Sequence, residues 1–358
     1  MSRLFPVIDL HAHWFPPSTL DILGRRAEAP RIGPQGEGLA IWRTGAGAGK
    51  GGAFPLGPQW YDVDARLAHL DAVEIAHQLV SWPTTLGVDA ALPAEKTLDL
   101  WTQWNNDTSA LVRRHPDRFS AVAALSTSDL AWSARELARG HEKLGLIGGV
   151  LPVNGFFSRA SAEQFRPLFE VAQAHRSHIY LHTGFANPVI AGQPPNLVYE
   201  DNDAIRWVID NGFHFASAVT TLAFTDFLAA FPDVTLQIAM LGGSGLGALA
   251  AEQAEVSPRI QAGPLRQHFR QIWLDTGAAG SGTAAVAAAI RVLGSERVVF
   301  GSDYAPLPDI RPTLQRVRAA TAHDPDSQNA VLSSNALGLL GRHDGLSERL
   351  LSHKDFTS

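Results

Sequence analysis

The chain has 358 residues, of which 45% are hydrophobic, and a formal net charge of −6. This length is sufficient for one large core, and the mildly acidic chain has no basic stripe, so no nucleic-acid partner is predicted. It contains no cysteine, which excludes disulfides, thiolate catalysis and cysteine-ligated zinc.

The first predicted element is a buried strand over residues 7–15, an apolar run that contains Asp9, His11 and His13. Successive side chains of a strand point to opposite faces, so His11 and His13 share one face. Two adjacent imidazoles can bind one divalent cation, since neutral imidazole is a common zinc ligand. The pair alone is also compatible with two polar residues where a strand leaves the core.

A Gly- and Pro-rich segment over about residues 16–60 follows this strand. It contains RIGPQGEG and GAGAGKGGAF, and the entropic cost of ordering glycine predicts no regular structure there. Trp42, Arg43, Phe54 and Trp60 punctuate the segment, and long ordered loops in compact enzymes are often lids. We therefore expect a lid inserted after strand one, with a disordered loop as the alternative. A phosphate-binding loop is disfavoured because no helical pattern follows the glycines.

From residue 61 onward, apolar runs alternate with helical periodicity. Seven further strands are predicted, over residues 75–82, 119–126, 149–153, 178–184, 234–241, 272–276 and 298–303. Helices lie between them, and helices over about 310–345 close the chain. Strands too far apart for hairpins predict an α/β fold, a (β/α)8 TIM barrel that forms a single domain over residues 1–358. A doubly wound open sheet is the alternative, but it usually has fewer strands and a glycine fingerprint after strand one.

The chain has no recognisable targeting or membrane segment. Its first ten residues, MSRLFPVIDL, lack the long apolar core and cleavage site of a signal peptide. No stretch reaches about 18 apolar residues without a charged or polar interruption, so no membrane contact is predicted. We expect a soluble cytoplasmic protein.

Reactive groups of such barrels lie at the carboxyl ends of the strands. His11 and His13 end strand one, His182 in LHTG ends strand five, and Asp303 in FGSDY ends strand eight. Each residue alone is an ordinary polar group at a strand end. Together they bring three imidazoles and one carboxylate to one mouth, which predicts a mononuclear metal site with room for water.

Several motifs occur in one order from residue 7 to about 341: DLHAH, FRPLFEVAQAH…IYLHTG, AAFPDVTLQIA, IWLDTG, VVFGSDY and SSNALGLLG. In concert they make the chain similar to the amidohydrolase-related family, which includes aminocarboxymuconate semialdehyde, γ-resorcylate and 6-methylsalicylate decarboxylase-like enzymes. The resemblance implies a metal-dependent barrel enzyme that acts by non-oxidative decarboxylation, hydrolysis or hydration. It also implies that His11, His13, His182 and Asp303 hold one divalent ion, zinc or alternatively manganese, and that the chain forms a homodimer.

One motif departs from the family pattern. After FPD the family has a strand and then His-Gly-Gly or His-Met-Gly, whereas the same spacing here reaches Met240 in AMLGG. A thioether cannot take up a proton near pH 7 and is a poor ligand for a hard or borderline cation. Three alternatives stay open: Asp303 transfers the proton alone, His214 replaces the missing histidine, or the chemistry has changed. We name Asp303 and His182 as the catalytic residues.

Neighbouring residues receive mainly structural interpretations. No lysine lies at a predicted strand end, and strand four reads GGVLPV. Relatives with two metals bridge them by a carboxylated lysine from that strand, so a single metal is favoured. Asp9 lies on the strand face opposite the histidines and is predicted to hold backbone groups or residues around the ligands. Asp275 resembles a family position of mainly structural use.

Aromatic side chains cluster near the predicted barrel mouth, which suits a planar or apolar ligand. We predict a small-molecule partner, an aromatic compound or a carboxylic acid. The candidate substrate-binding residues are Trp14, Trp82, Phe185, Met240 and Arg43. Arg43 is the candidate clamp for a carboxylate, because its planar guanidinium binds one through two hydrogen bonds.

The leading hypothesis is a single-metal carboxy-lyase for an aromatic or unsaturated carboxylic acid. The second is a metal-dependent hydrolase of an amide, lactone or ester, in which Asp303 accepts the proton of the attacking water. The third is a repurposed barrel that binds a ligand without turning it over, which Met240 favours and the intact ligand set disfavours.

Overall fold

A parallel barrel is the centre of the fold. The computed structural model describes residues 5–43, 52–197, 203–260, 262–343, 345, 348 and 350. The barrel strands are β1 (Val7–His13), β5 (Ile75–Ser81), β6 (Phe119–Ala121), β7 (Ala123–Ala124), β8 (Gly148–Pro152), β9 (His178–His182), β10 (Thr235–Ile238), β11 (Ile272–Asp275) and β12 (Val298–Val299). All their ladders are parallel, and β6 and β7 together occupy one strand position.

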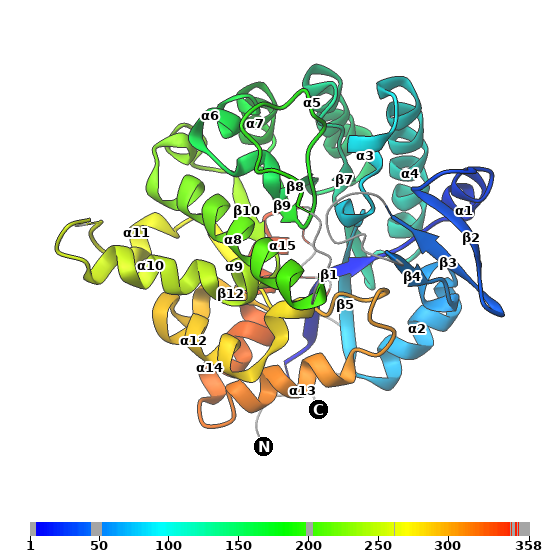
Figure 1. Ribbon diagram of the computed structural model, residues 1–358. Coiled ribbons are helices and arrows are strands. Elements are labelled where there is room, and N and C mark those ends of the chain that lie inside the picture. Colours follow the sequence, from blue (N-terminus) through cyan, green and yellow to red (C-terminus); the bar gives the residue numbers. More distant parts are fainter. Residues whose placement is uncertain are drawn as a thin grey trace.

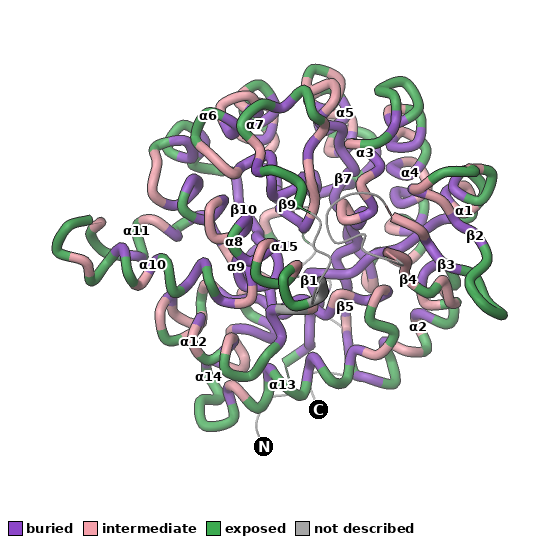
Figure 2. The backbone as a smooth tube through the Cα atoms, in the orientation of Figure 1, coloured by how far each residue is buried: buried purple, intermediate pink, exposed green. Residues whose placement is uncertain are grey.

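The barrel closes between its last and first strands. A parallel bridge joins Ala12 to Tyr304, and the N–H of Leu10 donates to the carbonyl of Phe300 at 2.9 Å. The strands are buried on both faces, as expected for a parallel sheet covered by helices, and they form the buried centre seen in Figure 2. The eight predicted strands and the TIM-barrel fold are therefore confirmed.

Helices surround the barrel (Figure 1). They are α2 (Val63–Ala72), α3 (Val88–Ala91), α4 (Ala94–Arg114), α5 (Leu130–Arg139), α6 (Arg159–Glu163), α7 (Arg166–Ala174), α8 (Asp203–Phe224), α9 (Met240–Ser244), α10 (Leu246–Val256), α11 (Leu265–His268), α12 (Thr283–Leu293), α13 (Arg311–Ala320), α14 (Pro325–Asn329) and α15 (Asn335–Leu340). Two helical segments lie between β9 and β10, the long α8 and a short 3-10 helix over Phe227–Ala230. The strand predicted over 234–241 is shorter in the structure, where β10 ends at Ile238.

The segment after β1 is more regular than predicted. It contains α1 (Pro17–Gly24) and an antiparallel sheet of β2 (Arg31–Gln35), β3 (Gly38–Trp42) and β4 (Ala53–Pro55). The prediction of no regular structure is wrong there, because Gly36, at a φ of +60°, forms the hairpin turn and leaves the flanking runs free to pair. Residues 44–51, which include most of the GAGAGKGG run, lie outside the described residues.

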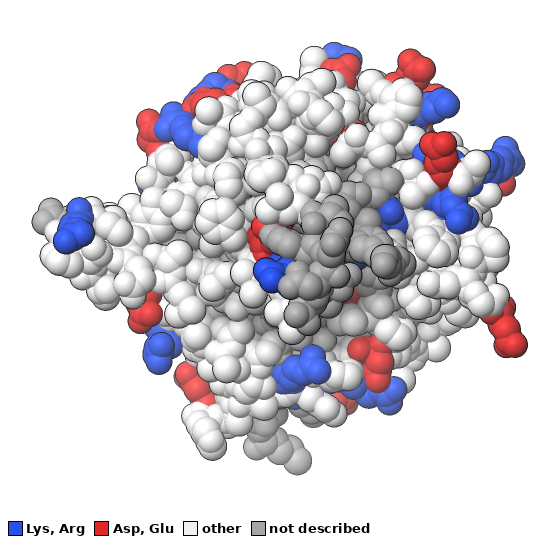
Figure 3. Space-filling view, viewed as in Figure 1, with Lys and Arg blue, Asp and Glu red and all other residues white. Residues whose placement is uncertain are grey.

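The surface of the face in Figure 3 carries mixed charge. Basic and acidic side chains lie mostly around its edge, and neither sign forms a continuous patch. Among the described residues, no helix has the combined length and apolarity needed to cross a bilayer.

Candidate metal centre

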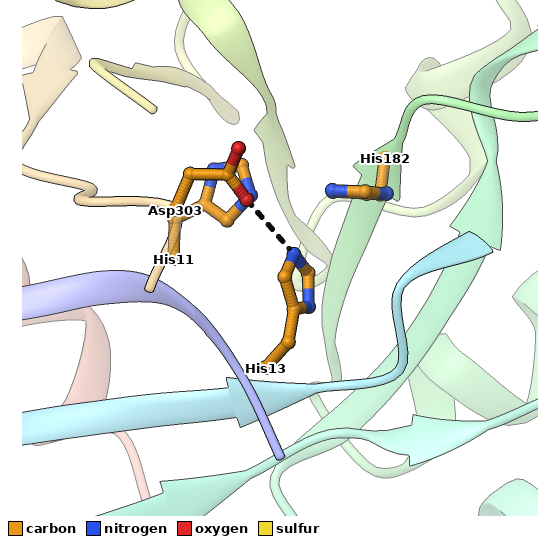
Figure 4. Close-up of side chains that lie close together, drawn as sticks. All are labelled: His11, His13, His182 and Asp303. Carbon is orange, nitrogen blue, oxygen red and sulfur yellow. Dashed lines mark ion pairs between the residues drawn. The ribbon is translucent and has the colours of Figure 1, made fainter. Parts of the chain in front are cut away.

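Four side chains from two barrel strands and the loop after a third converge (Figure 4). His11 and His13 lie on β1, His182 ends β9, and Asp303 lies just beyond β12. Their candidate ligand atoms all lie within 4.8 Å of one another. Asp303 Oδ1 is 3.2 Å from the Nε2 atoms of both His11 and His13. We call these four residues the metal-ligand cluster.

Each imidazole of the cluster is held through its Nδ1 atom, which leaves Nε2 available. The partners are Asp275 Oδ1 for His11 at 3.0 Å, the Ser81 carbonyl for His13 at 3.1 Å and Thr84 Oγ1 for His182 at 3.2 Å. The Nε2 atoms of His11 and His13 are buried, and within the described part of the chain they have no hydrogen-bond partner beyond their ion-pair contact with Asp303. Buried nitrogens of this kind fit a bound cation, so the residues present are compatible with a divalent metal.

The cluster is electrostatically arranged to attract positive charge. Burial alone would lower the pKa of His11, but the carboxylates of Asp275 and Asp303 outweigh burial and raise it to about 10. Burial would likewise raise the pKa of Asp303, whereas its contacts with His11 and His13 hold that pKa well below its usual value. Burial and the neighbouring imidazoles lower the pKa of His182, which keeps its lone pair free.

A chain of hydrogen bonds fixes His11 from beneath. Asp275 Oδ1 accepts from His11 and from the backbone N–H of Gly277 at 2.8 Å. Its other oxygen accepts from Gln237 Nε2 at 2.6 Å, and Gln237 Oε1 lies 3.0 Å from His178 Nε2. Asp275 therefore orients His11 without lining the cavity described below, in agreement with the structural use predicted for it.

Asp9 ties the first strand to the last loop. It accepts from Gln78 Nε2 at 2.7 Å and from both the backbone N–H and the hydroxyl of Ser302, at 2.9 and 2.6 Å. Ser302 immediately precedes Asp303, whose φ is +58° and whose N–H donates to the His11 carbonyl at 2.9 Å. Asp9 thus holds the backbone that presents Asp303, as its structural interpretation predicted.

Two glycines near His11 were missed by the sequence analysis. A Cβ atom at Gly277 would lie 2.1 Å from His11 Nδ1, and one at Gly301 would lie 2.6 Å from His11 Cβ. Both contacts are too short for any side chain, so these positions give the ring its space. Both glycines occur in the quoted motifs, LDTG and FGSD. The reason for glycine at these positions is their contact with His11, which the sequence alone does not reveal.

A cavity of about 260 Å³ opens above the cluster. Its walls include His13, His182 and Asp303 together with Arg43, Phe54, Thr85, Thr183, Trp207, Met240, Ala278, Pro306 and Leu307. Of the predicted substrate-binding residues, Arg43 and Met240 lie in these walls. The Arg43 guanidinium carbon is 5.0 Å from the centre of the Phe54 ring and 5.8 Å from that of Trp207.

Three predicted aromatic contacts lie elsewhere. Trp14 and Trp82 are 5% and 1% exposed and do not line the cavity. The Trp82 ring packs edge-on against Trp101 and Trp104, so its place at a strand end serves the core and not the mouth. Phe185 lines a neighbouring space and not the cavity above the cluster.

That neighbouring space is a side chamber of about 70 Å³. It shares Arg43, Thr85, Thr183 and Trp207 with the larger cavity. His214 lines the side chamber and is absent from the walls of the cavity that contains the cluster. His214 therefore does not occupy the position left by the missing histidine.

Met240 occupies that position. It is 5% exposed, adopts a φ of +57° and begins a turn in which residues 241–245 also have positive φ. The Thr183 hydroxyl donates to Met240 Sδ at 3.2 Å, and Asn211 Nδ2 lies 3.9 Å from the same sulfur. The cavity wall here offers a polarizable apolar surface and no proton acceptor of useful basicity.

Comparison with known proteins places this geometry in a family. The profile of the amidohydrolase family matches residues 8–342. γ-Resorcylate decarboxylase of Rhodococcus jostii is 23% identical over 302 residues, which cover 76% of this chain and 88% of that protein.

Solved structures share the fold at lower identity. Apo IDCase of Metarhizium anisopliae has a TM-score of 0.73 and 20% identity, with coverage of 96% of this chain and 98% of that chain. The 5-carboxyvanillate decarboxylase of Novosphingobium aromaticivorans has a TM-score of 0.68 and 15% identity, with coverage of 94% and 96%. With the family profile spanning nearly the whole chain, this protein belongs to the amidohydrolase family.

Proposed function

We propose that this protein is a metal-dependent carboxy-lyase that decarboxylates an aromatic or unsaturated carboxylic acid without oxidation. The observation that carries the proposal is the metal-ligand cluster at the base of a largely apolar cavity that also contains one arginine. Its similarity to γ-resorcylate decarboxylase supports the reaction type. A similar solved structure, a 5-carboxyvanillate decarboxylase, contains manganese and 4-hydroxy-3-methoxy-5-nitrobenzoic acid.

We assign one divalent ion, zinc or manganese, to His11, His13, His182 and Asp303. Bound there, the ion would supply a Lewis acid that polarises the substrate's oxygen atoms. Three neutral imidazoles and a carboxylate suit zinc, while manganese accepts the same nitrogen and oxygen donors.

The cavity walls suggest how a substrate would be oriented. Phe54, Trp207 and Leu307 form apolar surfaces against which a planar ring can pack. The Arg43 guanidinium, held between the Phe54 and Trp207 rings, is placed to bind a carboxylate. We therefore assign Arg43 to the orientation of the substrate and the aromatic walls to the exclusion of water from the cavity.

Decarboxylation requires a proton at the carbon that loses the carboxylate. Among the described residues that line the cavity, Asp303 is the only carboxylic acid; His13, His182 and Asp303 are all assigned to the ion, and of these Asp303 has a second carboxylate oxygen that can carry a proton. We therefore assign the proton transfer to Asp303. Because its pKa lies well below the usual value, its carboxylate first takes up a proton from the solvent and then delivers it to the carbon. The carbon gains this proton, the bond to the carboxylate breaks, its electron pair returns to the substrate and CO2 leaves.

In this proposal, the segment after β1 acts as a lid. Arg43 and Phe54 lie on either side of residues 44–51, which are outside the described residues, and both line the cavity. We propose that residues 1–358 form a single domain in which the described part of this insertion covers the mouth.

Release of CO2 from ring-hydroxylated benzoates tests the proposal. The metal-loaded wild type is expected to release one CO2 per substrate consumed, with no incorporation of water into the other product. Asp303→Asn should reduce the rate by about 10²- to 10⁴-fold, the usual effect of losing an acid–base group. Asp326→Asn, on the exposed surface of α14, is the matched control and should retain wild-type activity.

A product that has gained water, or equal rates in wild type and Asp303→Asn, would contradict this assignment. The first outcome would favour a hydrolase and the second would remove Asp303 from proton transfer.

We also propose that the protein is a homodimer. Ile205, Ile209 and Phe213 are spaced four residues apart along α8, so they share one side of the helix, and they are 57–65% exposed. Leu246 and Leu249 of the adjacent α10 are also exposed. An exposed apolar face formed by two neighbouring helices is typical of a protein–protein interface.

A further inference from the structure

The side chamber has no part in the decarboxylation chemistry assigned above. Its wall is continuous with that of the main cavity through Thr183 and Trp207. Thr84, whose hydroxyl contacts His182 Nδ1 at 3.2 Å, also lines the chamber. A ligand that lies over the metal-ligand cluster therefore has a second space beside it.

Asn154 lines this chamber and carries a buried hydrogen-bond acceptor. It follows β8, is 2% exposed, and its Oδ1 atom has no hydrogen-bond partner among the described residues. Its backbone is held on both sides, since its N–H donates to Gly184 and its carbonyl accepts from Phe157. A buried acceptor without a partner costs about 1–3 kcal/mol, so the oxygen is suited to a donor supplied by a ligand.

A second acceptor lies on α8. Asp210 and His214 are one helical turn apart and both line the chamber, with Asp210 Oδ1 3.7 Å from His214 Nε2. That separation is too long for a hydrogen bond, so neither side chain satisfies the hydrogen-bonding capacity of the other. Burial lowers the pKa of His214 despite the opposing charge of Asp210, and the ring meets the edges of Phe157 and Phe185.

We propose that the side chamber binds a hydrogen-bond-donating substituent of the substrate, a hydroxyl or amino group, between Asn154 and Asp210. This inference rests on the proposed function, because it describes a part of the same substrate. A second carboxylate would be repelled by Asp210 and would offer Asn154 Oδ1 no proton. The volume of about 70 Å³ corresponds to roughly two water molecules, which suits a hydroxyl or amino group.

Calorimetric binding to the manganese-loaded protein tests the proposal without requiring turnover. The probes are salicylates that carry a hydroxyl, a methoxy or a second carboxylate group at the meta or para ring position. In the wild type, the hydroxyl compound should bind at least about tenfold more tightly than its methoxy and carboxylate counterparts at one of these positions. Asn154→Leu should abolish this preference while leaving the affinity for the methoxy compound unchanged.

Asn329→Leu is the matched control, because Asn329 Oδ1 is also buried, has no partner among the residues that the structure describes, and lies outside both cavities. If Asn154→Leu does not fold, Asn154→Ala removes the same oxygen without adding a branched side chain. Equal affinities in the wild type, or a preference that survives loss of the Asn154 amide, would overturn the proposal and leave the proposed function standing. If no salicylate binds the metal-loaded wild type, the proposed function fails and this inference fails with it.

Discussion

At the scale of single residues, the metal-ligand cluster depends on groups that never touch its centre. The His11 ring is fixed by Asp275 and is closely bordered by Gly277 and Gly301. Asp303 is held by Ser302 and Asp9 through the preceding backbone. Residues that orient ligands in this way commonly change metal affinity about 10- to 100-fold when they are replaced.

Gly277→Ala tests the space beside His11. The added methyl group would lie 2.1 Å from His11 Nδ1 and 3.0 Å from Asp275 Oδ1, so it should displace the ring and break their hydrogen bond. We expect the affinity for manganese or zinc to fall by about 10- to 100-fold in a competitive chelator titration. Gly338→Ala is the control, because no atom of the described residues lies within 4 Å of its added methyl group. Unchanged metal affinity in Gly277→Ala would show that this contact does not position His11.

Met240→Leu tests whether the residue at the missing-histidine position transfers a proton. Both side chains are apolar and of similar volume, so the cavity wall should be kept. If Asp303 alone transfers the proton, kcat/KM for CO2 release should change by less than about tenfold, against the 10²- to 10⁴-fold cost of losing an acid–base group. A loss of that larger size would assign Met240 a direct part in the reaction.

At the scale of secondary-structure elements, buried polar side chains connect the strands across the barrel. His178 on β9 contacts Gln237 on β10, which donates to Asp275 on β11. Asp275 then accepts from His11 on β1. The two neutral contacts of His178, with Thr235 Oγ1 and Gln237 Oε1, are satisfied by one uncharged tautomer.

The buried state of His178 predicts a pH dependence of stability. Burial, with a smaller contribution from Arg342, lowers its pKa to about 4 against an ordinary value of 6.5. Between these values the unfolded chain binds a proton that the folded protein excludes, so the free energy of unfolding falls as the pH drops. The full effect is about 3 kcal/mol at or below pH 4 and is absent above about pH 7.

Urea unfolding of wild type and His178→Gln between pH 7 and pH 4 measures this effect. The variant should lose less stability across this window, while His323→Gln, at an exposed position, should follow the wild type. Parallel pH profiles for wild type and His178→Gln would contradict the argument.

The sequence predicted the elements that depend on local pattern. Barrel strands such as 148–152 and 178–182 are short apolar runs buried on both faces, so their pattern alone located them. The hairpin of β2 and β3 was missed because a glycine-rich composition conceals which single glycine makes the turn.

For the candidate site too, the sequence predicted only the residues whose place follows from a local pattern. The four cluster residues follow from their places at strand ends, because parallel strands bring those ends together. Gly277 was missed because its role exists only through contact with His11, more than 260 positions away. Trp82 was misplaced because a strand-end position does not decide whether a ring turns into the core or towards the mouth.

At the scale of the whole molecule, the cavity lies at one mouth of the barrel. Helix α8 lies beside this mouth, with one side towards the side chamber and the other on the outer surface. His214 of α8 faces the side chamber, whereas Ile209 and Phe213 are exposed. A dimer formed through the exposed side of α8 would therefore lie next to the elements that line the substrate cavity.

Light scattering after size exclusion tests this interface. The wild type is expected to have the mass of two chains, and Ile209→Glu with Phe213→Glu should give a monomer, because two buried charges without partners would oppose association. Leu39→Glu on β3, which also replaces an exposed apolar side chain, should remain a dimer. A wild-type monomer, or a dimer that survives the double substitution, would exclude this face as the interface.

The most direct test of the account is the metal content of the purified protein, measured by elemental analysis. The wild type, reconstituted with zinc or manganese, is expected to contain close to one ion per chain. Substitution of both His182 and Asp303 by alanine removes two of the four cluster residues and should abolish binding. Replacement of the exposed His323 and Asp326 by alanine should leave the content unchanged. No metal in the reconstituted wild type, or the same content in the cluster variant, would contradict the proposed metal-dependent chemistry.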